Sequence, residues 1–267
     1  MAGRFVHLLI LLIAVVMLTI STAPPIVTAQ EGTLTPTEQL GKSIFFDTTL
    51  SLNRNQSCAS CHGPQAGWTG PDEMINSWGA VYEGSIAGRF GDRKPPSAAY
   101  ATQSPVFFRD KKGDFVGGNF WDGRATGEIL GSPAADQAMG PFLNPMEQAL
   151  PTAAEVVYRV CQAGYSVLFR ETWGNDICDI SNIDSAFGAI AISIAYYESS
   201  SEVNAFTAKY DYTFKGMAKL SKEEQLGYAL FRGKAGCHRC HISNGQAALF
   251  TDYTYDNLGL PQNPANP

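Results

Sequence analysis

The feature that most constrains this chain is a pair of short motifs, Cys58-Ala59-Ser60-Cys61-His62 and Cys237-His238-Arg239-Cys240-His241. The spacing C-x-x-C-H is typical of c-type haem attachment, in which both thiols form thioethers with the porphyrin and the histidine binds the iron. We therefore expect two covalently bound c-type haems, with His62 and His241 as axial ligands of the haem iron. A redox-active dithiol, or one zinc ion shared by the two cysteine pairs, is the alternative.

Residues 1–29 have the pattern of a cleavable export signal. An apolar run extends from Leu8 to Ile20, and Val27-Thr28-Ala29 provides small residues for cleavage before Gln30. A retained membrane anchor is the alternative, but the run is shorter than the ~20 residues that span a bilayer. We expect a mature protein in the periplasm, which agrees with haem attachment outside the bacterial cytoplasm.

Composition gives two further expectations. The formal net charge is −6 without any block of like charges, so nothing favours a nucleic-acid partner. An acidic face could attract a basic electron-donor protein, although a solvated surface explains the same charge. Outside the haem motifs only Cys161 and Cys178 remain. In an oxidising compartment they are expected to form a structural disulfide.

Each haem motif follows a similar predicted helix. Thr35 and Glu38 form the pattern of a capping box around Pro36, and Ser221 and Glu224 repeat this pattern near the other end of the chain. Both helices contain the letters Glu-Gln-Leu-Gly, followed five residues after the Leu by Phe. An internal repeat explains this better than the coincidence of two helix starts. We therefore predict two cytochrome c-like haem domains, residues 30–212 and 213–267.

The rest of the pattern predicts a mostly α fold with long loops. One helix is expected from Thr152, carrying apolar residues as far as Leu168, and a second, nearly all apolar and buried, from about Ile183 to Tyr197. The segment from Gly63 to Pro151 is rich in Gly, Pro, Trp and Asn and has little periodicity. Long loops of this kind inside a compact domain are usually functional.

The histidine count limits how the iron atoms can be ligated. Besides His62 and His241, the chain has only His7 in the export signal and His238 inside a haem motif. No free histidine is left to bind the sixth position of either iron. Lys94, a tyrosine or a methionine could still do so, the candidate methionines being Met74, Met139, Met146 and Met217. An iron with one open position can activate a small oxidant, whereas a closed one transfers electrons.

Several further segments occur in a fixed order along the chain. They are Leu40-Gly41-Lys42 with Phe45-Phe46-Asp47, Phe120-Trp121-Asp122-Gly123-Arg124-Ala125, Asp136-Gln137-Ala138 and Asn144-Pro145-Met146-Glu147. Together with both haem motifs they cover nearly all of the mature chain. In these segments the chain resembles the bacterial dihaem cytochrome c peroxidases and their relatives.

The resemblance implies that the first haem reacts with hydrogen peroxide and that the second receives electrons. It also implies that Trp121 lies between the haems, with Gln137 and Glu147 over the open face of the first iron. Cleavage of a peroxide needs a base for one proton and an acid that returns it, and Glu147 can be both. Gln137 offers a donor and an acceptor to orient the peroxide. Pro141 and Pro145 predict that both residues lie on a rigid loop.

Departures from the family pattern predict differences in function. Classical members have a histidine that closes the peroxide site, and residues 63–93 contain none. The first haem is then expected to be open in every redox state, as in the relatives that oxidise a protein partner. Arg93-Lys94-Pro95-Pro96 replaces the segment with a calcium ligand, which makes a bound calcium doubtful. Arg124 is expected to bind either a haem propionate or Asp122.

The sequence therefore leads to one main hypothesis and two alternatives. The main one is a periplasmic dihaem peroxidase that reduces hydrogen peroxide to water with electrons from a small cytochrome c or copper protein. The alternatives are peroxide-dependent oxidation of side chains in a partner protein, and an electron-transfer cytochrome without catalysis. Only 26 residues follow His241, so the second domain is expected to be incomplete and the chain to be a fragment.

Overall fold

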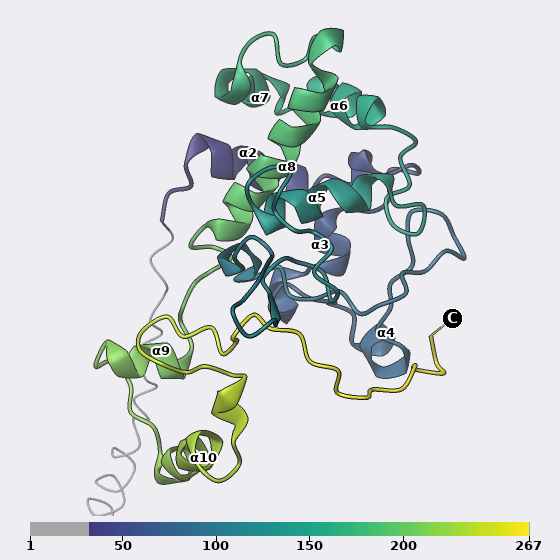
Figure 1. Cartoon of the computed structure of the whole chain (residues 1–267). Helices are drawn as coiled ribbons and strands as arrows, with labels where there is room; N and C mark the ends of the chain where they lie inside the picture. Colours follow the sequence, from purple (N-terminus) through teal and green to yellow (C-terminus); the bar gives the residue numbers. More distant parts are fainter. Residues whose placement is uncertain (1–31, 267) are drawn as a thin grey trace, which may run out of the picture. The chain divides into compact units, whose positions relative to one another are not determined.

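The computed structural model describes residues 32–266 (Figure 1), and the predicted export signal lies outside the described residues. Helices dominate, which confirms the mostly α prediction. They are α2 (Pro36–Phe45), α3 (Cys58–Cys61), α4 (Glu73–Trp78), α5 (Pro133–Leu143), α6 (Ala153–Gln162), α7 (Ser166–Trp173), α8 (Ile183–Ser199), α9 (Lys209–Phe214) and α10 (Lys222–Arg232). Two short strands that the sequence did not predict, β1 (Phe108–Arg109) and β2 (Phe115–Val116), pair antiparallel. Within residues 32–266, no helix has the length and apolar character needed to cross a membrane.

Both predicted capping boxes are present. At the start of α2, the Glu38 N–H donates to Thr35 Oγ1 at 3.3 Å and the Thr35 N–H donates to Glu38 Oε2 at 2.7 Å. At the start of α10, the Glu224 N–H donates to Ser221 Oγ at 3.2 Å and the Ser221 N–H donates to Glu224 Oε2 at 2.6 Å. Each box satisfies amide groups that a helix leaves without intrahelical partners at its N-terminus.

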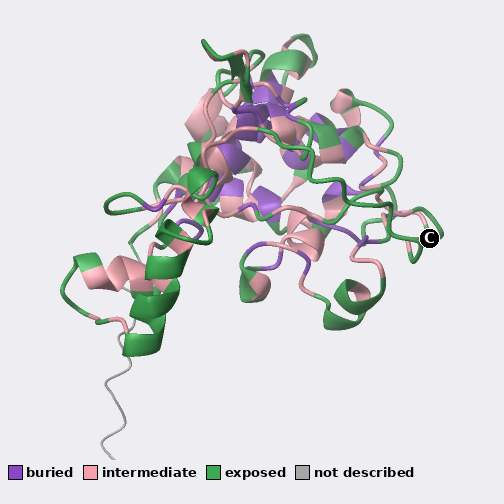
Figure 2. Ribbon diagram, turned by 60° about the horizontal axis from the view of Figure 1, so that its bottom comes forward, coloured by how far each residue is buried: buried purple, intermediate pink, exposed green. Residues whose placement is uncertain are grey.

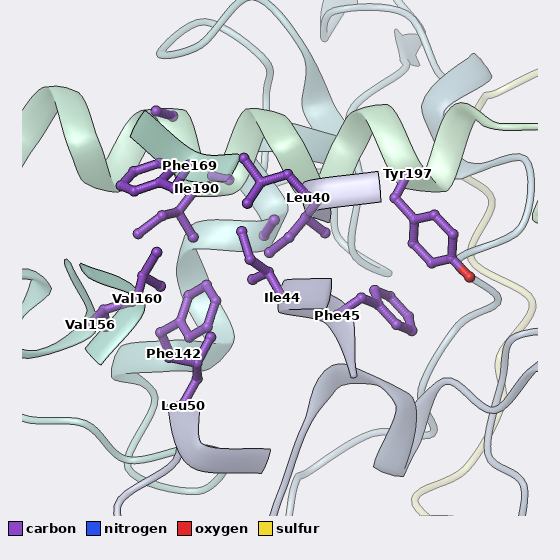
Figure 3. Packing of buried hydrophobic residues seen from close by; sticks show 14 of the residues in the cluster. Leu40, Ile44, Phe45, Leu50, Phe142, Val156, Val160, Phe169, Ile190 and Tyr197 are labelled. Carbon is purple, nitrogen blue, oxygen red and sulfur yellow. The ribbon is translucent and has the colours of Figure 1, made fainter. Parts of the chain in front are cut away.

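Helix α8 lies at the centre of the hydrophobic core and packs against α2, α5 and α6. Figure 3 shows Leu40 and Ile44 of α2 pointing toward Ile190 of α8, and Phe45 lying near Tyr197. Gly41 permits the close approach of α2 to α8, because a Cβ at this position would collide with the carbonyl of Ser193. This burial confirms the prediction of a buried apolar helix from about residue 183.

One predicted helix is divided in two. Thr152 caps α6 as expected, with its Oγ1 accepting from the Glu155 N–H at 3.2 Å, but α6 ends at Gln162. Ala163 adopts an extended conformation, so Leu168 belongs to the separate helix α7. The prediction of one helix reaching Leu168 was wrong because apolar spacing alone does not reveal a break of three residues.

The Cys161–Cys178 disulfide forms as predicted. It joins the last turn of α6 to the segment that follows α7. The link therefore ties the short helix α7 to its neighbours on both sides.

The predicted domain boundary, between residues 212 and 213, falls inside α9. Side chains from the first half of α9 contact α10: the hydroxyls of Tyr210 and Tyr228 lie 3.0 Å apart, and Lys209 forms an ion pair with Glu224. Helix α10 has no buried residue and is drawn in the colours of exposed and intermediate residues in Figure 2. The boundary itself stays a prediction.

Candidate functional site

The first C-x-x-C-H motif forms the short helix α3 and the residue after it. The His62 N–H donates to the carbonyl of Cys58 at 2.9 Å, which closes the turn. Cys58, Cys61 and His62 all line one cavity of about 550 Å³. This turn therefore presents two thiols and one imidazole to the same space, as attachment of one macrocycle requires.

The His62 imidazole is oriented by the backbone. Its Nδ1 lies 3.2 Å from the carbonyl of Trp68, so a proton on Nδ1 is donated there and Nε2 keeps its lone pair. Burial lowers the pKa of His62, which favours the neutral ring. Trp68 is itself buried against Phe45 and Tyr197. In the tautomer with the proton on Nδ1, the ring can bind a metal through Nε2.

The cysteines at this site are suited to covalent attachment rather than to zinc. Both are unpaired, and burial raises the pKa of Cys61 to about 12 and also raises that of Cys58. Thiol exchange needs a thiolate, which such values disfavour. Cys237 and Cys240 do not line this cavity, and no group of three or more His, Cys, Asp or Glu in residues 32–266 is arranged to hold a metal ion.

The walls of the cavity fit a haem. The side-chain oxygens of Gln56 and Gln148 are buried in the wall and have no hydrogen-bond partner among the described residues. Aromatic and aliphatic side chains cover other parts of it, among them Phe45, Phe120 and Ile194. A flat apolar group with polar edges matches this lining. Cys58 and Cys61 would form its thioethers, and His62 would bind its iron.

Glu147 lies in the wall of this cavity, at the end of a turn that follows α5. The Glu147 N–H donates to the Asn144 carbonyl at 3.0 Å, and Asn144 Nδ2 donates to Glu147 Oε1 at 2.8 Å. One carboxylate oxygen is thereby held in place. Burial raises the pKa of Glu147, although the bond from Asn144 opposes the shift. A carboxyl with a raised pKa can donate a proton as well as accept one.

Gln137 lines the same cavity but lies on a helix, so the predicted rigid loop was wrong for this residue. Ser132 caps α5, Pro133 occupies its first position, and Pro141 lies inside it. Pro141 has no N–H to donate to the Gln137 carbonyl four residues earlier, yet the helix continues to Leu143. Favourable residues at the start of the helix outweigh one missing hydrogen bond.

Asp136 explains how α5 is held in place beside the cavity. Its buried carboxylate accepts from the N–H groups of Gly127 at 2.8 Å, Ile129 at 3.2 Å and Leu130 at 2.8 Å. The loop before α5 is therefore wrapped around the residue that precedes Gln137. Asp136 acts by positioning this wall.

Trp121 and Arg124 also line the cavity. Trp121 Nε1 donates to the Lys94 carbonyl at 2.8 Å, while 57% of the residue is exposed. Arg124 binds both carboxylate oxygens of Asp122 at 2.8 Å, and its guanidinium lies 3.8 Å from the centre of the Phe120 ring. Of the two partners expected for Arg124, the structure contains the ion pair with Asp122.

The positions of the candidate residues reduce the choice of a sixth ligand for the iron at His62. None of the methionines considered lines the cavity, and Met74 and Met217 are exposed. Lys94 lines it, but its ammonium group donates to Thr69 Oγ1 at 2.7 Å. The cavity-lining tyrosines are Tyr82, Tyr100, Tyr253 and Tyr255. His62 is the one histidine of residues 32–266 in this wall.

The second C-x-x-C-H motif makes the same two backbone contacts, from a 3-10 turn in a more open setting. His241 N–H donates to the Cys237 carbonyl at 3.0 Å, and His241 Nδ1 lies 2.8 Å from the Phe250 carbonyl. Cys237, Cys240 and His241 are all exposed. The motif could hold a second haem through the same three groups, with Nε2 of His241 left for the iron.

Several cavity residues were not predicted from the sequence. Gln56 and Gln148 lie outside every motif, and Tyr253 and Tyr255 come from the segment after the second haem motif. Glu198 lines the cavity from α8. Glu198 follows directly after the apolar run that was predicted as a buried helix up to Tyr197, and nothing in the sequence marked it as a residue of the site.

Comparison with known proteins was made at the levels of sequence and structure. A family model described as di-haem cytochrome c peroxidase matches residues 35–219. The chain is 37% identical over 229 residues to the methylamine utilization protein MauG of Paracoccus denitrificans, covering 84% of this chain and 57% of MauG. It is 33% identical over 227 residues to the cytochrome-c peroxidase IdrP2 of a Pseudomonas species, covering 85% of this chain and 51% of the relative.

The chain is also similar to a solved structure of a diheme peroxidase. The diheme peroxidase BthA of Burkholderia thailandensis superposes with a TM-score of 0.77 at 28% identity, covering 89% of this chain and 57% of BthA. The chain thus spans little more than half the length of these relatives. The matches confirm the family resemblance and the two c-type haems that it implies.

Proposed function

Because the chain belongs to the di-haem cytochrome c peroxidase family, whose members are peroxide-dependent oxidoreductases, we propose that its protein reduces hydrogen peroxide to water. The haem that His62 would hold would be the site of reaction with peroxide, and the haem that His241 would hold would receive electrons from a small cytochrome c or copper protein. The observation that supports this most directly is that Glu147 and Gln137 line the same cavity as Cys58, Cys61 and His62. The periplasm is the proposed location.

The residues of the chain would transfer protons to and from the peroxide and would orient it. When bound, the haem supplies the iron that accepts a peroxide oxygen and exchanges electrons. Glu147, held by Asn144, takes the proton from one peroxide oxygen and returns it to the other. With two electrons from the donor and two protons from water, one peroxide gives two water molecules. Gln137 orients the peroxide through its amide.

Trp121 is the proposed electron relay. Its indole lies in the cavity wall, and its N–H is fixed by the carbonyl of Lys94. An aromatic ring fixed in this way keeps a constant position relative to the haem at His62. Replacing Trp121 by Phe would then slow electron delivery while leaving the first reaction with peroxide unchanged.

A second candidate function is oxidation of side chains in a partner protein. Two observations favour it: the higher identity to MauG, 37% against 33% for IdrP2, and the exposure of Trp121, which reaches from the cavity wall to the surface. Turnover of peroxide with a reduced small cytochrome favours the first function. Consumption of peroxide only in the presence of a protein substrate favours the second.

The experiment that tests the proposal is rapid mixing of the ferric dihaem protein with hydrogen peroxide, followed by the haem absorption spectrum. We expect a fast spectral change without prior reduction, slowed roughly 10²- to 10⁴-fold in Glu147→Gln, which keeps the size but removes the carboxylate. Glu171→Gln, an exposed change on α7, is the matched control. If the unmodified protein shows no spectral change, the peroxidase proposal is refuted and the hypothesis of an electron-transfer cytochrome remains. Equal rates in both variants would refute the role of Glu147.

A further inference from the structure

Glu198 is a buried carboxyl that the proposed peroxide chemistry does not use. It lies near the C-terminal end of α8, is 5% exposed, and lines the same cavity as His62. Its carboxylate makes no hydrogen bond or ion pair with any residue between 32 and 266. Buried carboxyl groups are normally paired or hydrogen-bonded, and the cavity that Glu198 lines is the space from which a partner can reach this one.

The position of Glu198 is fixed by its neighbour. Tyr197 is 1% exposed and packs edge-to-face on Phe45 and Trp68, with its hydroxyl 3.3 Å from Glu202. The next residue along the helix therefore projects from a rigid part of the core. Burial first, and then the charge of Glu198, raise the pKa of the Cys58 thiol, and both residues line the same cavity.

The charged groups on the elements packed against α8 are already paired with other residues. Lys42 of α2 binds Glu202 at 2.6 Å, Asp136 of α5 binds backbone amides, and Arg159 of α6 binds Glu155 at 2.7 Å. The short helical turn at Ala101–Gln103 has no titratable side chain. The titratable groups of the cavity wall are Cys58, Cys61, His62, Tyr82, Asp92, Arg93, Lys94, Tyr100, Arg124, Glu147, Tyr253 and Tyr255.

Desolvation alone raises the pKa of Glu198 to about 8. A ferric haem carries one more positive charge than a ferrous haem, and a nearby positive charge favours the ionised carboxylate. Reduction of the iron removes that charge, so the carboxyl then binds a proton more readily. Glu147 is less suited to binding this proton, because it is only half-buried and already accepts a hydrogen bond from Asn144.

We propose that Glu198 is a proton-binding residue of the His62 haem site, which takes up one proton when this haem gains one electron and releases it when the electron leaves. The electron comes from the donor protein and converts ferric to ferrous iron, while the proton comes from water and forms the carboxyl O–H bond. The proposal requires haem at His62 but not peroxidase activity. Its failure and the failure of the proposed function are therefore distinguishable.

The test is the reduction potential of the two haems in the holo-protein, measured by spectroelectrochemistry across a pH series. We expect the potential of one haem to fall as pH rises, by up to about 59 mV for each tenfold fall in proton concentration. The slope levels off above about pH 8, where the carboxyl is ionised in both redox states. The C237A/C240A variant, which keeps only the His62 haem, must retain this slope.

Glu198→Gln, which cannot bind the proton, is expected to abolish the slope, whereas Glu171→Gln is expected to keep it. A slope that persists in Glu198→Gln overturns the proposal. If that variant does not fold, the infrared difference spectrum between the reduced and oxidised unmodified protein decides. A protonated-carboxyl band that appears on reduction supports the proposal, and the absence of such a band overturns it.

Discussion

The two haem motifs follow helices of similar sequence that lie in different environments. Leu40 of α2 is fully buried, whereas its counterpart Leu226 of α10 is 68% exposed. A Cβ on Gly41 would strike the backbone of α8, whereas one on Gly227 would meet nothing within 4 Å. The capping boxes of the two helices are nevertheless alike.

This difference separates a local property of the two helices, the capping box, from burial, which depends on a partner helix. A capping box is completed within four residues, so it forms wherever its sequence occurs. Burial of Leu40 depends on α8, to which α2 makes more contacts than any other element does. Helix α10 contacts its own haem motif and α9.

The largest effect is expected for truncation of the repeated leucine. Leu40→Ala removes a fully buried side chain beside α8 and should lower the free energy of unfolding by about 2–5 kcal/mol. Leu226→Ala removes an exposed side chain and should change it by less than about 0.5 kcal/mol. Denaturant unfolding of both variants measures the difference. Equal losses would show that α10 is buried in solution.

A smaller effect, with opposite signs, is expected for the repeated glycine. Gly41→Ala should destabilise the protein by about 1–3 kcal/mol, because α2 must move away from Ser193. Gly227→Ala should stabilise α10 by about 0.5–1 kcal/mol, because alanine favours helix and meets no neighbour there. Amide hydrogen exchange in each helix gives both values. Destabilisation of α10 by the second change would contradict the comparison.

The smallest difference is expected between the caps. Thr35→Ala and Ser221→Ala each remove a side-chain oxygen that accepts from a helix N–H and should each cost the respective helix about 1 kcal/mol. Hydrogen exchange of the first turn of α2 and α10 measures these costs side by side. A much larger cost at Thr35 would mean that the cap also depends on tertiary contacts.

The sequence predicted much of the fold because the relevant signals are local. Capping residues located the starts of α2, α6 and α10, and apolar spacing identified α8. It missed the break between α6 and α7 and the helical position of Gln137. Gly164 lies in the break, but the apolar spacing continues past it. Pro141 indicated a loop, but α5 continues through it to Leu143.

The residues of the candidate site also fall into two groups, those that the sequence identified and those that it did not. Cys58, Cys61 and His62 were identified from spacing alone because three groups in five residues must reach one macrocycle. Glu147 and Gln137 were identified only through a family resemblance, because two polar residues ten positions apart carry no local signal. Glu198 and the unpartnered side-chain oxygens of Gln56 and Gln148 were found only in the structure.

The sequence by itself determined which chemistry the chain can support: two haem motifs, two capped helices and no histidine to spare for a sixth iron ligand. The tertiary structure alone decided which motif lines a cavity and which groups face it. The physical reason is that attachment motifs and caps are completed within a few residues. A cavity wall requires side chains from segments as distant as Gln56, Glu147 and Tyr255, brought together by the packing of α8 against α2 and α5.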